Sequence, residues 1–195
     1  MNTPQESAYT FHLLTPQRWA DFERLFGAHG AYGGCWCMFW FLRGSAFTRG
    51  QGEANRLAMK SRVEAGETPG MLAYLGDEPV GWCAFGPREG YPRLQAARTL
   101  KPVDNLPVWS VVCFYVAKGH RRRGVSKALL KAVIEEVRRR GGKVVEGYPS
   151  PSTGEGRPGP FVYLGLEAAF REAGFVDVAR PTPHRLIMRY VIENA

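Results

Sequence analysis

The sequence predicts one α/β domain in which helices cover both faces of a mixed, mostly antiparallel sheet. Its 195 residues are the length of a single ordinary domain that can bury a core. Its hydrophobic share of 45% and charged share of 23% are those of a folded globular protein. Strand and helix patterns follow one another in the order β, α, α, β, β, β, α, β, α, β, β. We therefore expect one domain over residues 1–195, with a flexible start at residues 1–8.

The first half of the chain predicts two helices followed by a hairpin. Pro16 suits the first turn of a helix, and Gly66 suits the end of one. A Gly-Asp-Glu-Pro turn between two apolar runs predicts the hairpin. The expected elements are a strand (9–15), a helix (16–30), a helix (52–66) and two hairpin strands (71–75 and 80–85).

The second half begins with an apolar strand, after a long connection over residues 86–107. The clearest helix of the chain lies between two strands, which should therefore be parallel neighbours. Within it, Glu135 and Glu136 should reach Arg139 and Arg140 at i,i+4 spacing, and Gly141 should end it. The expected elements are a strand (108–117), a helix (121–141), a strand (143–149), a mobile loop (149–160), a helix (161–174) and two strands (175–181 and 184–192).

The formal net charge of +8 is concentrated in one window of the sequence. Residues 118–143 hold ten Lys or Arg against two Glu, a net +8, while the other residues are balanced at 16 basic and 16 acidic. This distribution indicates a local anion site rather than a generally basic surface.

The four cysteines, at positions 35, 37, 83 and 113, form no CxxC pair. No further Cys or His pair has zinc spacing, so we expect buried free thiols and no metal. The first residues lack the charged and apolar regions of a signal peptide, and no apolar run is long enough to span a bilayer. We expect a cytoplasmic protein without a membrane partner.

The segment KGHRRRGVSK, residues 118–127, places three arginines between a buried strand and a helix. Arginines are unfavourable at a helix N-terminus, whose dipole is positive, unless an anion neutralises them. The free amides of the first helical turn bind phosphate well, and Gly124 allows the backbone to approach a ligand without a Cβ. The segment therefore predicts a phosphate site.

The stretch YVAKGHRRRGVSKALL resembles the acyl-CoA motif R/Q-x-x-G-x-G/A of the GNAT superfamily of N-acyltransferases. Arg121 and Gly124 match the motif, and Ser126 stands where Gly or Ala is usual. The order of elements and the EAGF turn are also similar to the superfamily. The resemblance implies a splayed pair of parallel strands, acetyl-CoA as co-substrate and, as is common in the superfamily, a homodimer. It implies cofactor contacts at Phe114, Tyr115, Val116, Arg121, Arg122, Arg123, Gly124, Val125, Ser126 and Lys127.

The catalytic groups cannot be carried over from the resemblance. The position of the usual acidic base is Ser110, and the position of the usual tyrosine proton donor is Phe170. Strand alternation places Glu146 and Tyr148 on one face, so Glu146 is a candidate base and Tyr148 a candidate acid, together with Tyr163. A paired carboxylate at a strand end and half-buried packing tyrosines are the alternatives.

The acceptor pocket should be formed by the aromatic segment before the second helix and by the connection 86–107. Aromatic walls with arginines suit an amine, of a small molecule or a peptide, that also bears a carboxylate or phosphate. The alternative is that the aromatic side chains only pack under the sheet. The candidate acceptor residues are Trp36, Trp40, Arg88, Tyr91 and Ser110.

Three functions remain open at this point. An acetyl-CoA-dependent N-acetyltransferase acting on a primary amine agrees with the motif and with the order of elements. An acyl-CoA-binding module without catalysis agrees with the changed residues at Ser110 and Phe170. Nucleic-acid binding agrees only with the basic window and lacks a recognisable binding motif, so we expect no nucleic-acid partner.

Overall fold

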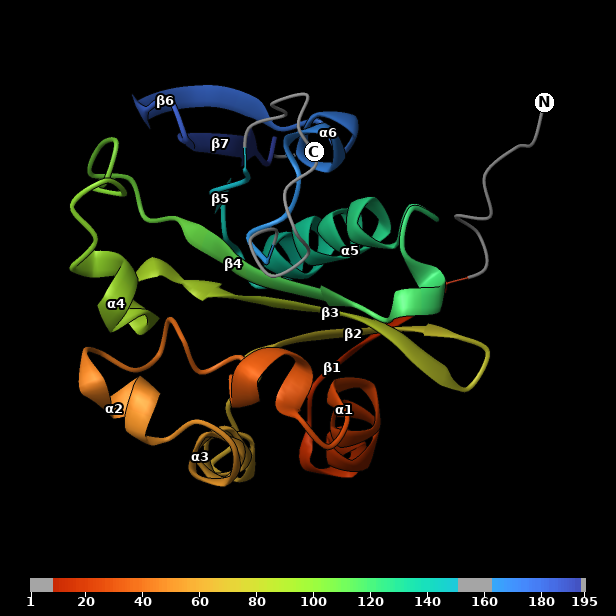
Figure 1. Ribbon diagram of the computed structural model, residues 1–195. Helices are drawn as coiled ribbons and strands as arrows, with labels where there is room; N and C mark the ends of the chain where they lie inside the picture. The colour runs from red at the N-terminus through yellow and green to blue at the C-terminus, as the bar shows by residue number, and fades with distance from the viewer. Residues whose placement is uncertain (1–8, 151–162, 194–195) are drawn as a thin grey trace.

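A seven-stranded sheet forms the centre of the protein, with helices on both of its faces (Figure 1). The computed structural model describes residues 9–150 and 163–193. The strand order is β1-β2-β3-β4-β5-β7-β6, and all neighbouring pairs are antiparallel except β4 and β5, which confirms the expected mixed fold. The strands are β1 (Tyr9–Leu13), β2 (Gly70–Leu75), β3 (Glu78–Pro87), β4 (Trp109–Val116), β5 (Val144–Gly147), β6 (Val176–Thr182) and β7 (Arg185–Val191). The helices are α1 (Trp19–Phe26), α2 (Ser45–Arg49), α3 (Glu53–Glu64), α4 (Pro92–Gln95), α5 (Val125–Arg139) and α6 (Glu167–Glu172).

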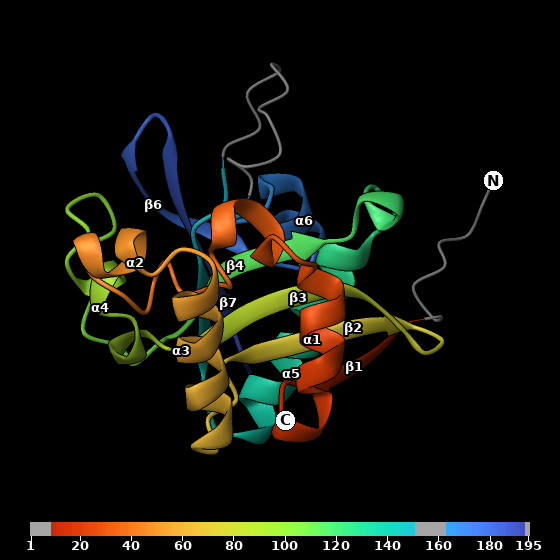
Figure 2. The same cartoon turned by 60° about the horizontal axis from the view of Figure 1, so that its bottom comes forward.

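The sheet separates two apolar cores. On one face, Leu129, Val133 and Val137 of α5 recur every four residues and are fully buried against the strands. On the other face, α1 and α3 cover the sheet (Figure 2). They bury Phe22 and Met59. Apolar side chains pack against both faces of the central strands, so the ends of these strands have fixed positions.

The parallel strands β4 and β5 pair over only three residues and then part. Trp109, Ser110 and Val111 face Val145, Glu146 and Gly147 in register. β4 continues to Val116, paired on its other side with β3 alone. The β3–β4 register shifts where β4 contributes one extra residue, and such a bulge bends a strand. The splayed strand pair expected from the sequence is therefore present.

Helices α1, α5 and α6 are shorter than the sequence predicts. Helix α1 ends at Phe26 rather than at 30, and Gly27 after it has a φ of 66°. Helix α5 begins at Val125 rather than at 121, because Arg122 and Gly124 have left-handed φ values of 62° and 80°. Residues 163–166 are not helical, and Gly165 among them has φ 88°. None of the helices in the described ranges is both long and apolar enough to cross a membrane.

The ion pairs on α5 also differ in part from the expected pattern. Glu136 holds Arg140 as predicted, and it holds Arg139 as well. Glu135 pairs with Arg138 three residues later, so the expected Glu135–Arg139 pair is wrong. Residues three apart on a helix are neighbours just as residues four apart are, so Arg138 can take the place of Arg139 as the partner of Glu135. The expected flexible start and, from residue 151, the expected mobile loop lie outside the described residues.

Candidate active site

The basic turn between β4 and α5 has the features of an anion site. A short helical turn, Lys118–His120, leads from β4 into an extended Arg121 and then into the left-handed Arg122 and Gly124. A Cβ built on Gly124 meets no atom within 4 Å, so the backbone is open to a ligand. Left-handed residues in such a turn can direct neighbouring amides toward one side, as in anion-binding nests.

The charge of this turn is not neutralised within the described part of the chain. Arg121, Arg122 and Arg123 are all exposed, and none of them forms an ion pair with a carboxylate of the described residues. Arg121 donates from Nε to the carbonyl oxygen of Val116, 3.1 Å away, which ties the turn to the end of β4. Three cations beside a helix N-terminus favour a multiply charged anion such as a pyrophosphate.

The last residues of β4 lie where β5 has left the sheet. Phe114, Tyr115 and Val116 pair only with β3, so one edge of this stretch of β4 is not covered by β5. The amide of Phe114 donates to the carbonyl oxygen of Tyr163 at this edge. The amide of Phe114 is thus engaged, as is the carbonyl oxygen of Val116, so an extended ligand would use the remaining backbone groups at this edge of β4 on its way to the basic turn.

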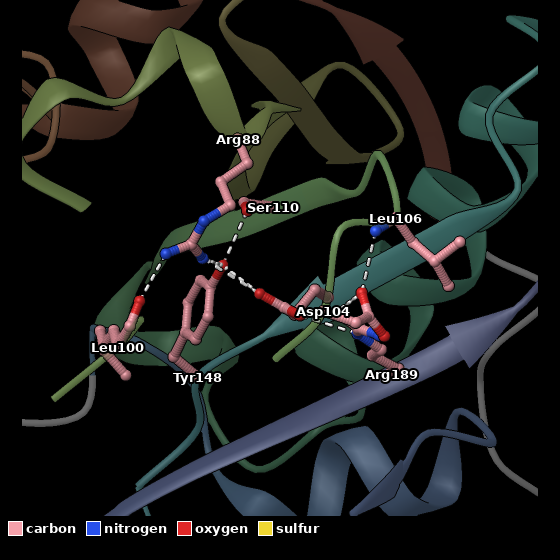
Figure 3. Close-up of polar contacts among 8 residues, drawn as sticks. Arg88, Leu100, Asp104, Leu106, Ser110, Tyr148 and Arg189 are labelled. Carbon is pink, nitrogen blue, oxygen red and sulfur yellow. Dashed lines mark hydrogen bonds and ion pairs between the residues drawn. The ribbon is translucent and has the colours of Figure 1, made fainter. Parts of the chain in front are cut away.

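A buried polar cluster lies at the point where β4 and β5 part (Figure 3). The hydroxyl of Tyr148 is its centre. It donates to Oε1 of Glu146 at 2.7 Å, accepts from NH1 of Arg88 at 2.7 Å, and lies 2.8 Å from Oγ of Ser110. Arg88 also donates to Oε1 of Glu146 at 3.1 Å and to the carbonyl oxygen of Leu100. This buried point thus ties β4 and β5 to the long connection that follows β3.

A second arginine reaches the cluster from β7. Arg189 donates from Nε to Oε2 of Glu146 at 2.8 Å, and its two terminal nitrogens hold Asp104 of the long connection. Arginine and carboxylate therefore alternate from Arg88 through Glu146 and Arg189 to Asp104, with no net charge. Such compensation is what allows ionised groups to be buried.

Comparison with known sequences decides the family. A sequence model of the acetyltransferase (GNAT) family matches residues 36–148, more than half of the chain. The protein belongs to the GNAT family. The matched stretch contains the whole of β2 to β5, the basic turn and, of the polar cluster, Arg88, Ser110, Glu146 and Tyr148.

Solved structures of GNAT acetyltransferases share the fold. An acetyltransferase of the GNAT family from Listeria monocytogenes has a TM-score of 0.58 at 7% identity, over 94% of this chain and 95% of its own. AAC(6')-Ib bound to paromomycin and acetyl-CoA has a TM-score of 0.53 at 16% identity, and AAC(6')-Ib bound to ribostamycin and coenzyme A has 0.55 at 17%. Both cover 94% of this chain and 93% of their own. No curated protein matches the chain significantly by sequence.

Both positions where GNAT enzymes commonly carry catalytic residues are buried here. Ser110 is fully buried within the polar cluster. Phe170 is fully buried in the core beneath α5, with its ring edge against Gly147. Neither position presents a titratable group.

Glu146 and Tyr148 lie on one face of β5, but their polar atoms are already engaged. The side chain of Glu146 is 1% exposed, and each carboxylate oxygen accepts from a guanidinium. Burial, and after it the charge of Glu146, raise the pKa of Tyr148, whose hydroxyl already has three partners. In this geometry Glu146 is a paired carboxylate, which is the alternative to a base that the sequence left open.

Tyr163 lies at the open edge of β4 and in a turn, not on the helix where the sequence placed it. It is half-buried, and its ring packs edge-on against Phe39 at 5.8 Å between ring centroids. Burial raises the pKa of Tyr163, and the positive charges of Arg185 and Arg93 oppose that shift. Of the three candidate catalytic side chains, Tyr163 is the one nearest to the place where an extended ligand would lie.

The candidate acceptor residues are more deeply buried than the sequence indicated. Trp36 stacks on Phe26, and Trp36, Trp40 and Tyr91 are at most 6% exposed. Arg88 belongs to the polar cluster. The sequence did not single out Phe47 and Asp104, because no local pattern distinguishes them.

Proposed function

We propose that this protein transfers an acetyl group from acetyl-CoA to a primary amine of a small molecule or a peptide. The observation that carries the proposal is the continuous path from the free edge of β4 into the turn of Arg122 and Gly124 at the start of α5. Membership of the GNAT family supports it, and so does the acetyl-CoA bound to AAC(6')-Ib, which has the same fold.

The residues present suit such a co-substrate. The left-handed turn, the free amides at the start of α5 and three uncompensated arginines match a pyrophosphate in charge and in hydrogen-bond donors. The backbone of Phe114 to Val116 matches an amide-containing arm. We assign cofactor binding to Phe114, Tyr115, Val116, Arg121, Arg122, Arg123, Gly124, Val125, Ser126 and Lys127.

Acetyl-CoA supplies an activated acetyl thioester. In the transfer, a C–N bond forms with the acceptor amine and the C–S bond breaks, while the amine loses one proton and the thiolate gains one. Tyr163 is the proton donor that we propose, because a phenol whose pKa is raised stays protonated and the backbone of Tyr163 is bonded to Phe114 at the edge of β4. Solvent takes the proton that the amine loses and returns one to Tyr163. Glu146 and Tyr148 act as positioning residues that hold β4 and β5 where they part.

Acetyl transfer is tested by incubating the protein with acetyl-CoA and a panel of primary amines. Release of free thiol together with a mass gain of one acetyl group on the amine is the expected result. Arg122→Gln combined with Arg123→Gln should raise the KM for acetyl-CoA roughly tenfold, the size of one lost charge-assisted hydrogen bond. Arg138→Gln is the control, because Arg138 lies in the last turn of α5, at the end far from the basic turn, and pairs with Glu135.

Two other outcomes would overturn the proposal. Binding of acetyl-CoA without product from any amine would indicate the non-catalytic binding module. Salt-sensitive binding of an oligonucleotide, lost in the arginine variants, together with no effect of acetyl-CoA on thermal stability would indicate nucleic-acid binding.

A further inference from the structure

The two connections on the α1 and α3 side of the sheet carry charge of one sign only. Residues 31–52 and residues 90–103 contain no Asp or Glu. Both segments lie on the side of β4 opposite to α5, and α2 and α4 are parts of them (Figure 1). This asymmetry is separate from the basic turn at the start of α5. The cations of the two segments are Arg43, Arg49, Arg93, Arg98 and Lys101.

Arg93 is held in place on an aromatic surface without a carboxylate partner. Its guanidinium lies 4.1 Å above the ring of Phe39 and 5.7 Å from that of Phe47. Its Nε donates to the carbonyl oxygen of Leu42 at 2.9 Å, and NH2 lies 3.4 Å from that of Gly44. These contacts fix the orientation of the side chain but leave its charge uncompensated, since no carboxylate of the described residues pairs with it.

Arg185 brings a second cation to the same place from the start of β7. It is half-buried, and its side chain forms no hydrogen bond or ion pair with a described residue. Arg185 and Arg93 both act electrostatically on the hydroxyl of Tyr163. The ring of Tyr163 contacts Phe39, over which Arg93 lies. Met188 of β7 pairs with Gly147, and Ser150 bridges Leu166, so Arg185, three residues before Met188, lies at the end of β7 that points toward the turn of Tyr163.

Two half-buried cations close to one position repel each other, and burial removes part of their hydration. A bound anion would offset both effects. We propose that the acceptor is an amine that also carries an oxyanion, a carboxylate or a phosphate, bound by Arg93 and Arg185 beside Tyr163. The apolar part of the acceptor packs against Phe39 and Phe47, which are half-buried. This inference rests on the proposed acetyl transfer and names the class of its acceptor.

The same charges disfavour acceptors that carry only amines. Ribostamycin, which AAC(6')-Ib binds in one of the similar structures, is a polyamine and would bring further positive charge to Arg93 and Arg185. Like charges brought together reduce affinity and slow association. The shared fold therefore does not imply that the acceptor of this protein carries the same kind of charge as ribostamycin.

The test compares three amines with one phenylethyl skeleton: phenethylamine, phenylalanine and 1-amino-2-phenylethylphosphonate. The last two carry a carboxylate and a phosphonate, and they separate the two oxyanion classes. We expect kcat/KM for at least one of them to exceed that for phenethylamine by about tenfold or more, as for one charge-assisted hydrogen bond. Arg185→Gln should remove most of this advantage, read as the ratio of kcat/KM for the oxyanion-bearing amine to kcat/KM for phenethylamine in the same variant.

Arg180→Gln is the matched control, since Arg180 lies on the same β-hairpin and has Asp177 as its partner at 3.8 Å. Arg93→Gln should act like Arg185→Gln. Dissociation constants of the three amines, measured in the presence of coenzyme A, provide a readout that does not need turnover. Absence of product from every amine would overturn acetyl transfer, while the ratio of dissociation constants would still decide the class of ligand. Phenethylamine binding and reacting as well as both oxyanion-bearing amines would overturn the inference.

Discussion

The hydroxyl of Tyr148, the residue directly after β5, donates to Oε1 of Glu146 in that strand at 2.7 Å. Two residues separate them in sequence, as strand alternation requires. The contact lies at the last paired residues of β4 and β5, where the strands part. Its partners Arg88 and Arg189 come from a different connection and a different strand, so a change at Glu146 should be felt across the whole sheet.

Glu146→Gln should destabilise the protein strongly, by about 3 kcal/mol. Removing one member of a buried ion pair leaves its partners as uncompensated buried charges, and here Arg88 and Arg189 would both lose the carboxylate. Urea unfolding measures the loss. Glu135→Gln is the control, because Glu135 is exposed and its pair with Arg138 should contribute less than about 1 kcal/mol. Unchanged stability with a shifted pH–rate profile would instead make Glu146 a base.

Gly124→Ala should weaken acetyl-CoA binding and cost about 1 kcal/mol of stability. An Ala at φ 80° is in the left-handed region, where a Cβ is unfavourable by roughly that amount. Gly141→Ala at the other end of α5 is closely matched, with φ 78° and open space around the added Cβ. Both variants should lose similar stability, and only Gly124→Ala should raise the KM for acetyl-CoA. Equal KM values in the two variants would argue against a phosphate site at this turn.

Phe170→Tyr should lower stability without raising kcat. It restores the residue common in the family, but the tip of the Phe170 ring lies against Gly147, where an added Cβ would be 2.6 Å from Cζ. The new hydroxyl would be buried without a partner, at a cost of about 1–3 kcal/mol. Phe11→Tyr, at a half-buried ring on β1, should be tolerated. A gain in kcat for Phe170→Tyr would show that this position can still reach the thiolate.

The elements and the anion site could be predicted because their signals are local. Gly124 and the arginines before it form one short turn. The apolar positions that predict α5 all lie within that one helix. The same reasoning placed Glu146 and Tyr148 on one face of their strand. The start of α5 was misplaced because helix propensity does not report that Arg122 adopts a left-handed conformation.

The polar cluster could not be assembled from the sequence, because its partners are distant. Arg88 and Glu146 are 58 residues apart, and Asp104 and Arg189 are 85 apart. Nothing in the local pattern of either segment selects the partner. Arg88 therefore looked like an acceptor-pocket residue, whereas its side chain is buried between Glu146, Tyr148 and the carbonyl oxygen of Leu100. Only tertiary packing reveals that difference.

Stability should fall as the pH rises above about 10, and buried tyrosines are the reason. Burial is the largest cause that raises the pKa of four tyrosines in the folded protein. In the unfolded chain they ionise near pH 10. Above that pH the folded state keeps protons that the unfolded state has lost, so the free energy of unfolding decreases with pH until the folded groups also titrate. The four are Tyr74, Tyr91, Tyr148 and Tyr163.

Urea unfolding at pH 8, 10 and 11 measures this dependence, and phenolate absorbance gives an independent count. At pH 11 the folded protein should contain fewer phenolates than the same protein in denaturant. Tyr148→Phe should lose stability at pH 8, because Ser110, Arg88 and Glu146 each lose a partner. The decrease above pH 10 should be less steep in this variant, since one of the raised pKa values is gone. An identical slope would mean that Tyr148 ionises alike in the folded and unfolded chain, and that its hydroxyl is not held in the cluster.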